Sequence, residues 1–489
     1  MSISTALHNA YSGLTAASRS AESVTNNLAN ALTEGYARRE TSLSSVVADG
    51  LGQGVRVTGV ERATDRVATE SRRSAGTNSA VADLRLEAAE RMSRAMGDPT
   101  SGAALSDRVT AFERAIATAA NEPSSQTGLD LTVLRAGELA DQLNRASGEL
   151  SAIRADVEVQ IEGEVETLNT TLSDLKDINI EIRRRVNSSG DINGLLDKRE
   201  QLIDRVSEIV PVIVVERPFE QVALFTPEGG TLVDGHSSVA QFSFSATPFI
   251  DHSMTIGAPL SGLVVNGNTV PIGNGTGFFD GGSLGALFDV RDTEVPTLNG
   301  QLDGLARDLI ERLQDPAVDT SLAVGDAGFF TDGGAAFAVA NEVGLAGRIS
   351  VNALADPDQG GASWRVRDGL NAAAPGFAGQ NTILRNMETA MSVQRAPGAG
   401  LGMTSSNSAG GFFGSVTAGA AQAHGWHQEA ADFALTEYSV MREVESGRTG
   451  VDSDEQLQRL MDVERWYQAN ARVAQTLDDM MGELLRMVG

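Results

Sequence analysis

The chain has 489 residues and a formal net charge of −27 at pH 7, and 41% of its residues are hydrophobic and 5% aromatic. Such a composition predicts a globular protein of about two to four domains, and the acidic excess argues against nucleic acid or an anionic membrane surface as a partner. The absence of cysteine excludes disulfides, thiolate metal sites and cysteine nucleophiles, and no apolar run approaches the roughly 20 residues that span a bilayer.

The first predicted element is a helix that ends near Gly35. Its apolar residues form two series with a seven-residue spacing, offset by three residues, which is the a and d pattern of a coiled coil. Two strands, 43–47 and 55–60, follow the helix and are joined by a loop that contains glycines. The helix residues that we expect to contact a partner helix are Ile3, Leu7, Ala10, Leu14, Ala17, Ala21, Val24 and Leu28.

A longer helical layer follows and is interrupted in the middle. The predicted helices of this layer lie at 64–96, 102–121, 124–186, 195–210, 284–313, 381–394 and 412–445. The interrupting segment, 211–282, contains short β-prone runs separated by turn signals, which predict a small β domain. A glycine-rich mixed stretch lies between 314 and 371, and its function cannot be assigned from its composition.

The last predicted helix repeats the seven-residue pattern of the first, and only Asn470 interrupts its apolar character. We interpret Asn470 either as a tolerated exposed position or as a residue that sets the register of a helix bundle. Two such helices at opposite ends of one chain predict that they pair with each other or with the same helices of neighbouring subunits. The residues of this second seam are Leu460, Val463, Tyr467, Asn470, Ala474, Leu477, Met481, Leu484 and Val488.

Together these elements predict a mainly α fold with an inserted β domain, in which several domains are nested. A terminal domain of coiled-coil helices comprises 1–60 and 450–489, and a helical middle domain comprises 61–210 and 283–449. The small outer β domain comprises 211–282. We expect this outer domain to be an addition whose removal leaves export and assembly of the chain largely working.

Side chains that suit metal binding are present without the spacing that such sites need. His424 and His427 lie three residues apart, but no carboxylate pattern accompanies them, so a solvated helix face is the better interpretation. Asp452, Asp454 and Glu455 resemble part of a calcium loop that lacks its glycine and its last glutamate. Acidic residues in the first turn of a helix explain them adequately. We therefore expect no catalytic, cofactor-binding or metal-binding residues.

A secreted hydrolase carried on helical arms is an alternative from a different functional class. It needs an acid–base constellation in the β domain, where Asp234, His236, Asp251 and His252 are the available side chains. Their spacing matches no recognisable arrangement. A turnover assay would be needed to support this alternative.

Several separated stretches form a set of motifs that runs in order over most of the chain. These motifs are Tyr11-Ser-Gly-Leu, Ser23-Val-Thr-Asn-Asn-Leu-Ala-Asn, Gly35-Tyr-Ala-Arg, Gly54-Val-Arg-Val-Thr-Gly-Val-Glu-Arg, Leu195-Leu-Asp-Lys-Arg-Glu-Gln-Leu-Ile-Asp, Gly281-Gly-Ser-Leu-Gly-Ala-Leu, Gly450-Val-Asp-Ser-Asp-Glu-Gln and Tyr467-Gln-Ala-Asn-Ala-Arg-Val. Together they resemble one family, the axial proteins of the bacterial flagellum, which comprise rod, hook and hook-associated proteins.

The resemblance implies a structural subunit and not an enzyme. The Gly-Tyr-x-Arg form at Gly35 is similar to the hook-associated branch, which implies a place in the short ring-like zone that joins hook to filament. The implied partners are further copies of the chain in a ring-like helical homo-oligomer, the hook protein, the third hook-associated protein and an export chaperone at the C-terminal region. Another axial protein, such as the hook protein, is the alternative within the family.

The resemblance also implies a location outside the cell, in the flagellum. Axial proteins are exported unfolded through the flagellar type III apparatus and carry no cleaved signal. The first residues, Met1 to His8, agree with this expectation, because they lack the basic and apolar regions of a cleaved secretion signal.

Overall fold

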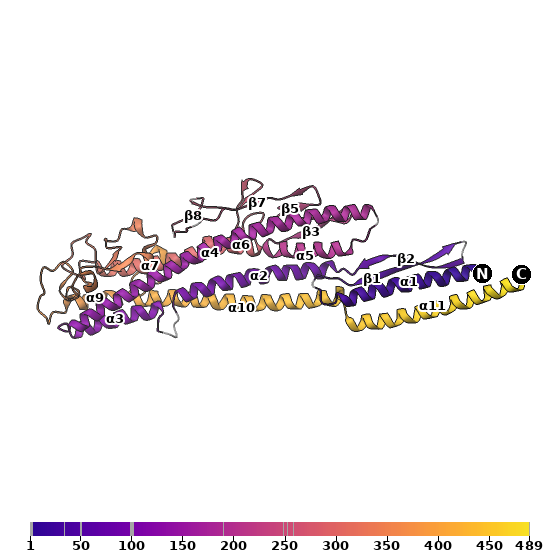
Figure 1. The fold of residues 1–489 in the computed structure, drawn as a ribbon. Helices are drawn as coiled ribbons and strands as arrows, with labels where there is room; N and C mark the ends of the chain where they lie inside the picture. The colour runs from indigo at the N-terminus through magenta and orange to yellow at the C-terminus, as the bar shows by residue number, and fades with distance from the viewer. Residues whose placement is uncertain are drawn as a thin grey trace. The chain divides into compact units, whose positions relative to one another are not determined.

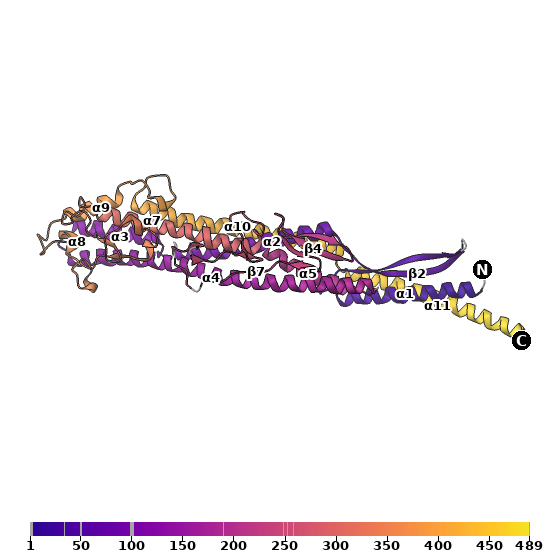
Figure 2. The same ribbon diagram turned by 90° about the horizontal axis from the view of Figure 1, so that it is seen from above.

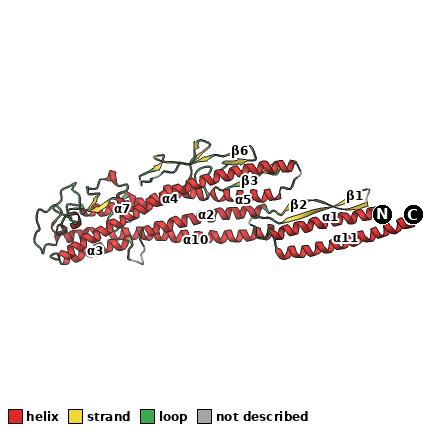
Figure 3. Cartoon of the chain, in the orientation of Figure 1, coloured by secondary structure: helices red, strands yellow, loops and turns green. Residues whose placement is uncertain are grey.

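The computed structural model describes residues 3–488 of the chain, apart from residues 34, 49–50, 98–101, 189, 248, 252 and 258. Helices predominate, and most strands are short (Figure 3). The helices are α1 (Ile3–Ala29), α2 (Arg66–Ala95), α3 (Leu105–Asn121), α4 (Gln126–Asn187), α5 (Asn193–Ile209), α6 (Gly282–Asp289), the π-helix η2 (Val290–Glu294), α7 (Val295–Leu313), α8 (Arg365–Asp368), α9 (Thr382–Ser392), α10 (Ala409–Thr449) and α11 (Ser453–Val488). The strands are β1 (Arg39–Ala48), β2 (Leu51–Arg62), β3 (Ile213–Arg217), β4 (Gln221–Phe225), β5 (Thr231–Asp234), β6 (Ser238–Val239), β7 (Phe242–Ser243), β8 (Thr255–Ile256), β9 (Pro259–Leu260), β10 (Val264–Val265), β11 (Asn268–Thr269), β12 (Phe330–Asp332) and β13 (Ile349–Val351).

The predicted mainly α, multidomain fold class is confirmed, and the described strands form a few small sheets. The helix limits agree closely with the apolar periodicity: the helix predicted at 124–186 is α4, Gln126–Asn187. One of the β-prone runs of the segment 211–282 extends from 239 to 244; it is not a single strand, because the described chain forms two separate two-residue strands there, β6 and β7.

The chain divides into two compact units, which are described separately. The terminal unit comprises Met1–Ser79, Thr170–Ala240 and Ala434–Gly489, and the central unit comprises Ala80–Asn169 and Gln241–Phe433. Each unit is therefore built from stretches that are far apart in the sequence. The finer three-domain division, with limits at 60, 210, 282 and 449, stays a prediction.

In the terminal unit, α1 lies alongside both the β1–β2 hairpin and α11 (Figure 1). The hairpin is antiparallel and extends from the pair Arg39 and Arg62 to the pair Ala48 and Leu51. Its strands are longer than the predicted 43–47 and 55–60. Helix α1 therefore contacts both strands of the hairpin in addition to α11.

A four-stranded antiparallel sheet, in the order β3-β4-β5-β6, is attached to the last part of α4 within the terminal unit. The attachment is made by Asn179, whose side chain is fully buried. Its Nδ2 donates hydrogen bonds to the carbonyl oxygens of Val222 (3.0 Å) and Gly235 (2.9 Å), and its Oδ1 accepts the N–H of Val222 (3.2 Å). Because the amide group is satisfied only in this position, it fixes β4 at one height on α4.

The apolar core of the central unit includes three aromatic rings. Phe112 of α3 lies against Phe329 and Phe330, and the three ring centroids are 5.4 to 5.9 Å apart. All three side chains are buried. Burial of rings of this size stabilises a domain by roughly 2 to 3 kcal/mol each, so this cluster is a main source of stability in the unit.

A buried ion pair joins α4 to η2 in the same unit. Glu158 and Arg291 lie 2.9 Å apart, and neither side chain is exposed. Loop backbone completes their hydrogen bonds, since Thr247 donates its N–H to Glu158 (3.1 Å) and Arg291 donates to the carbonyl oxygen of Ser261 (3.1 Å). The segment between β7 and β10 thus supplies the remaining hydrogen-bond partners of the buried charges of Glu158 and Arg291.

Candidate assembly interface at the paired terminal helices

Helices α1 and α11 lie side by side and run in opposite directions (Figures 1 and 2). Two contacts define their register. Asn27 donates a hydrogen bond to Gln456 (3.0 Å), and Gly13 lies against Asn470. On each helix the two contact positions are separated by 14 residues, as an unbroken antiparallel pair requires. Of the two arrangements predicted from the sequence, pairing of the terminal helices with each other is present within one chain.

The predicted seam residues of α1 and α11 range from buried to exposed, and their role in assembly stays a prediction. Those that are buried are Ala10, Ala17, Val24 and Val463. Those that are half-buried are Ile3, Leu7, Leu14, Ala21, Leu28, Leu460, Asn470, Ala474, Leu477 and Met481. Tyr467 and Leu484 are 49% and 47% exposed, and the side chain of Val488 lies outside the described residues.

Asn470 is the polar member of the seam, and it faces Gly13. A Cβ atom added at Gly13 would lie 2.6 Å from Oδ1 of Asn470, so a side chain at Gly13 would push the two helices apart or displace the amide. The Nδ2 of Asn470 donates to the carbonyl oxygen of Trp466 (2.9 Å), which orients the side chain. This fit favours the interpretation of Asn470 as a residue that sets helix register.

The hairpin is attached to α1 through Ser12. The Ser12 hydroxyl donates to the carbonyl oxygen of Asn9 (2.8 Å) and accepts the N–H of Val55 (3.1 Å). Gly54 has a φ of 91° and approaches Ser12 so closely that an added Cβ atom would lie 2.2 Å from its hydroxyl. The Tyr11-Ser-Gly-Leu motif therefore places Ser12 toward the hairpin and Gly13 toward α11.

A second attachment centres on Asn27, which is fully buried and makes four hydrogen bonds. Its Nδ2 donates to the carbonyl oxygen of Arg39 (2.9 Å) and to Gln456 (3.0 Å), and its Oδ1 accepts from the N–H of Arg39 (2.9 Å) and the hydroxyl of Tyr36 (2.9 Å). Ser23 also donates to the carbonyl oxygen of Arg39 (3.0 Å). One amide thus joins α1, β1 and α11.

Heptad periodicity did not identify Asn27 or Gln456 as interface residues, because that analysis selects apolar positions. The available signal was a pair of polar residues inside two of the family motifs, of which Gln456 lies seven residues before Val463 in an apolar series. Such residues are buried only where hydrogen bonds satisfy them.

Three carboxylates line one side of α5 and form what we call the acidic face: Asp197, Glu200 and Asp204. They lie three and four residues apart, which places them on one side of a helix. Asp197 accepts hydrogen bonds from Arg39 of β1 (2.7 Å) and from Arg62 at the end of β2 (2.7 Å).

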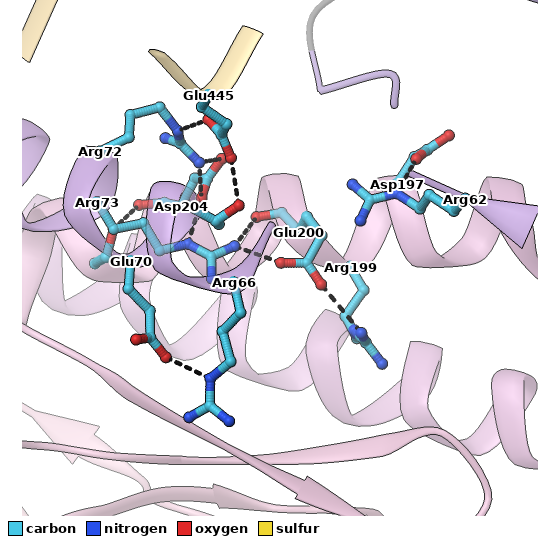
Figure 4. Close-up of polar contacts among 12 residues, drawn as sticks. Arg62, Arg66, Glu70, Arg72, Arg73, Asp197, Arg199, Glu200, Asp204 and Glu445 are labelled. Atoms are coloured by element: carbon cyan, nitrogen blue, oxygen red, sulfur yellow. Dashed lines mark hydrogen bonds and ion pairs between the residues drawn. The ribbon is translucent and has the colours of Figure 1, made fainter. Parts of the chain in front are cut away.

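The other two members of the acidic face bind α2 (Figure 4). Arg73 contacts Glu200 (2.5 Å) and Asp204 (2.6 Å), and Arg72 contacts Asp204 (2.8 Å). Arg72 also pairs with Glu445 near the end of α10. The Leu195-Leu-Asp-Lys-Arg-Glu-Gln-Leu-Ile-Asp motif, which the sequence could only match to a family, therefore supplies all three carboxylates of the acidic face, which hold arginines from the hairpin and from α2.

The pKa values follow from this arrangement. Burial alone would raise the pKa of Glu200, but Arg73, Arg199 and Arg62 outweigh that effect and lower it to about 2. Burial alone would lower the pKa of Arg73, and the carboxylates of Asp204 and Glu200 instead raise it above its usual value. These two shifts keep both Glu200 and Arg73 charged at neutral pH, so their contact is an ion pair.

The acidic residues that were considered for calcium binding have a structural role at the start of α11. Asp452 accepts the N–H groups of Asp454 (2.9 Å) and Glu455 (3.1 Å), as a residue at a helix start does. Among the described residues, no group of three His, Asp or Glu side chains is arranged to hold a metal ion. No described helix is long and apolar enough to cross a membrane.

Three of the four candidate hydrolase residues have other partners. Asp234 pairs with Arg217 (2.8 Å), and His236 contacts Arg183 (2.7 Å) and Gln221 (3.1 Å). Asp251 accepts the N–H of Ser253 (2.7 Å), and His252 lies outside the described residues.

Two family models match the chain. Residues 89–316 match the model of the flagellar hook-associated protein FlgK helical domain, and residues 448–487 match that of the flagellar basal body rod FlgEFG protein C-terminal region. The second match covers most of α11, and the first runs from within α2 to just beyond α7.

Individual relatives are similar to the chain over part of their length. Flagellar hook-associated protein 1 of Escherichia coli (strain K12) is 27% identical over 342 residues, which cover 68% of this chain and 60% of that one. The proteins of the same name from Salmonella typhimurium and Bacillus subtilis are 28% and 24% identical and cover 50% and 47% of this chain. The matches span 46% to 60% of the length of these relatives. A solved structure, that of the flagellar hook junction protein FlgK from Burkholderia pseudomallei, is 22% identical with a TM-score of 0.43 and covers 54% of this chain and 47% of that one.

Proposed function

Because the chain belongs to the family of flagellar hook-associated protein 1, a family of structural proteins, we propose that it is a structural subunit of the junction between flagellar hook and filament. In this role it binds no cofactor and catalyses no reaction. It assembles into the flagellum with other axial proteins through its terminal helices.

The observation that carries the proposal is the meeting of the two ends of the chain in one helix pair, α1 with α11, joined by the Asn27–Gln456 hydrogen bond. The residues of this pair come from the two family motifs at opposite ends of the sequence. A subunit that polymerises needs such a pair to present further apolar side chains to its neighbours. Trp466, Leu484, Leu485 and Met487 of α11 are 55%, 47%, 71% and 76% exposed, and they are available for this purpose.

The assembly interface in this proposal comprises the seam residues of α1 and α11 named from the sequence. Its closest partners are further copies of the chain in a ring-like helical homo-oligomer. The hook protein lies on one side of this ring and the third hook-associated protein on the other. An export chaperone holds the C-terminal region before secretion by the type III apparatus, and the mature location is extracellular.

Another axial protein, such as the hook protein, is the second candidate, since the match at 448–487 is to a model of rod and hook proteins. The match at 89–316, which covers α3 to α7, favours the hook-associated role instead.

The test is a strain that lacks this chain, complemented with an epitope-labelled copy. We expect the deletion strain to be non-motile and to shed filament protein into the medium. In the complemented strain, immunogold label seen by electron microscopy should form a narrow band where hook meets filament. Label along the whole hook would support the second candidate, and anchored filaments in the deletion strain would contradict the proposal.

A further inference from the structure

The acidic face of α5 lies where the hairpin and α2 approach each other within the terminal unit. Asp197 binds Arg39 and Arg62, one from each hairpin strand, so it holds the base of the hairpin. Glu200 and Asp204 bind arginines of α2 (Figure 4). The hairpin in turn holds α1 through Ser12 and Asn27, so the position of the acidic face is transmitted to the paired helices α1 and α11.

Two hollows adjoin the acidic face, so apolar packing does not fill this region. One has a volume of about 580 Å³ and is lined by α1, β2 and the start of α5, with Arg39 and Arg62 in its wall. The other has a volume of about 500 Å³, with Arg72, Glu200 and Glu445 in its wall. Because close packing is what normally makes a junction between elements rigid, the orientation of the hairpin on α5 depends here on polar contacts. These are the ion pairs of Asp197 and the hydrogen bond that Asn193 Nδ2 of α5 donates to the carbonyl oxygen of Val60 in β2 (2.9 Å).

The ion pairs are suited to this task because they are mostly shielded from water. The side chains of Asp197, Arg39 and Arg62 are 12%, 16% and 16% exposed. Removal of this carboxylate would leave the two guanidinium groups without the partner that they share, which is more unfavourable than loss of an exposed pair. Asp197 therefore has the largest effect per residue on this contact.

We propose that the acidic face of α5 is a positioning joint that sets the direction in which the paired helices α1 and α11 leave α2 and α5. Asp197 is its central positioning residue, and Glu200, Asp204 and Glu445 secure the α2 side. The purpose of the joint rests on the proposed function, since a fixed direction matters when copies of the chain must meet through these helices. The geometry of the joint is a property of the single chain.

The experiment measures the direction of the helix pair in the purified full chain. The sequence contains no cysteine, so Ser18→Cys on α1 and Ser439→Cys on α10 allow two spin labels at exposed positions of the terminal unit. We expect double electron–electron resonance to give one narrow distance distribution for the otherwise unchanged chain. Asp197→Asn should broaden that distribution about twofold, because several directions become populated.

Two further variants distinguish positioning from general instability. Asp197→Glu keeps the charge and should restore a narrow distribution, whereas Asp174→Asn, which neutralises an exposed carboxylate of α4 outside the network, should change nothing. Circular dichroism should report equal helix content in all variants. If Asp197→Asn does not fold, Arg62→Gln, which removes one of the two pairs, should still broaden the distribution.

An unchanged distribution in Asp197→Asn, or in Arg62→Gln where that variant replaces it, overturns the joint. Failure of Asp197→Glu to narrow the distribution also overturns it, because the charge would then not be the cause. This result is independent of where the protein is found in the cell. A chain that shows the expected distance changes but does not label the hook–filament junction retains the joint and contradicts the proposed function.

Discussion

Neighbouring residues of α1 have two different roles: one contacts the β1–β2 hairpin and the next contacts α11. Ser12 bonds the hairpin and Gly13 admits Asn470, so a one-residue shift of α1 would lose both contacts together. Asn27 repeats this arrangement two heptads later, with Arg39 on one side and Gln456 on the other. Specificity of pairing thus depends on a few polar or small residues placed among apolar ones.

The first prediction concerns Gly13. Gly13→Val should destabilise the helix pair by about 1 to 3 kcal/mol, because its Cβ atom would overlap Asn470. Asn470→Ala in the same chain should recover most of this loss by removing the obstructing amide. Urea denaturation followed by circular dichroism measures both effects. Gly482→Val is the matched control, since nothing lies within 4 Å of a Cβ atom added there on α11; equal stability of the two valine variants would contradict the prediction.

The second prediction concerns Glu200. Its pKa is about 2 in the folded chain, below the usual value, so its contribution to stability is fully present above about pH 4.5 and is lost as the pH falls toward 2. The loss should amount to about 3 kcal/mol at most, by the relation between pKa and free energy. In Glu200→Gln the free energy of unfolding should therefore depend less steeply on pH between about 2 and 4.5.

The prediction for Glu200 is tested by measuring the free energy of unfolding between pH 2 and pH 6 for the original chain, for Glu200→Gln and for Glu228→Gln. Glu228→Gln, an exposed glutamate in the turn after β4, is the control and should leave the curve unchanged. An acid limb that is as steep in Glu200→Gln as in the original chain would show that the ion pairs of Glu200 do not stabilise the fold.

At the scale of elements, α11 extends beyond its partner. The register defined by Gly13 and Asn27 places the start of α1 opposite about residue 480, so the last turns of α11 have no part of α1 beside them. Leu484 is 47% exposed there, whereas Leu477, seven residues earlier on the same face, is half-buried. On this face of α11, Leu477 therefore contributes to packing within the single chain, whereas Leu484 remains available to contact a neighbouring copy.

The third prediction uses this difference. Leu477→Asp should weaken the helix pair in the monomer and prevent incorporation, because an unpaired charge replaces an apolar contact worth roughly 1.5 to 3 kcal/mol. Leu484→Asp should leave the monomer as stable as before and still prevent incorporation. Circular dichroism of the monomer, and motility with shed filament protein in cells, separate the two effects once export has been verified. Normal motility with Leu484→Asp would mean that this face contacts no neighbour.

At the scale of the whole molecule, the inserted segment between α5 and α6 is bound to the helices that it covers. In the terminal unit, Asn179 of α4 bonds Val222 and Gly235. In the central unit, Arg154 of α4 donates to the carbonyl oxygens of Asp251 (3.2 Å) and Met254 (2.8 Å). These buried polar side chains depend on the insert, which argues against the expectation that it can be removed without effect.

The fourth prediction is accordingly that replacing residues 212–279 by a short Gly/Ser linker destabilises the remaining helices. The deletion leaves the buried groups of Asn179, Arg154, Glu158 and Arg291 without several of their partners, each at an expected loss of about 1 to 3 kcal/mol. Thermal unfolding measured by circular dichroism should show a lower midpoint and a less cooperative transition. An unchanged midpoint would restore the view of the insert as an independent addition.

The sequence by itself determined the helices, their approximate limits and the apolar seams of α1 and α11, because a seven-residue repeat is a local property that can be counted along the chain. It also showed a resemblance to the axial proteins of the flagellum, since the motifs occur in order along the chain. It did not determine what each motif residue does. The motifs contain Asp197 and Asn470 as polar residues, but the sequence did not indicate which residues they contact.

Only the tertiary structure decided those partners. Asn27 and Gln456 are 429 positions apart, and Arg39 and Asp197 are 158 apart. No periodicity connects positions so distant, because each contact depends on how several elements pack at once and on which buried polar groups find a complementary group there. For the same reason the hairpin that contacts α1, the Gly13–Asn470 fit and the joint on α5 follow from the fold and not from the pattern.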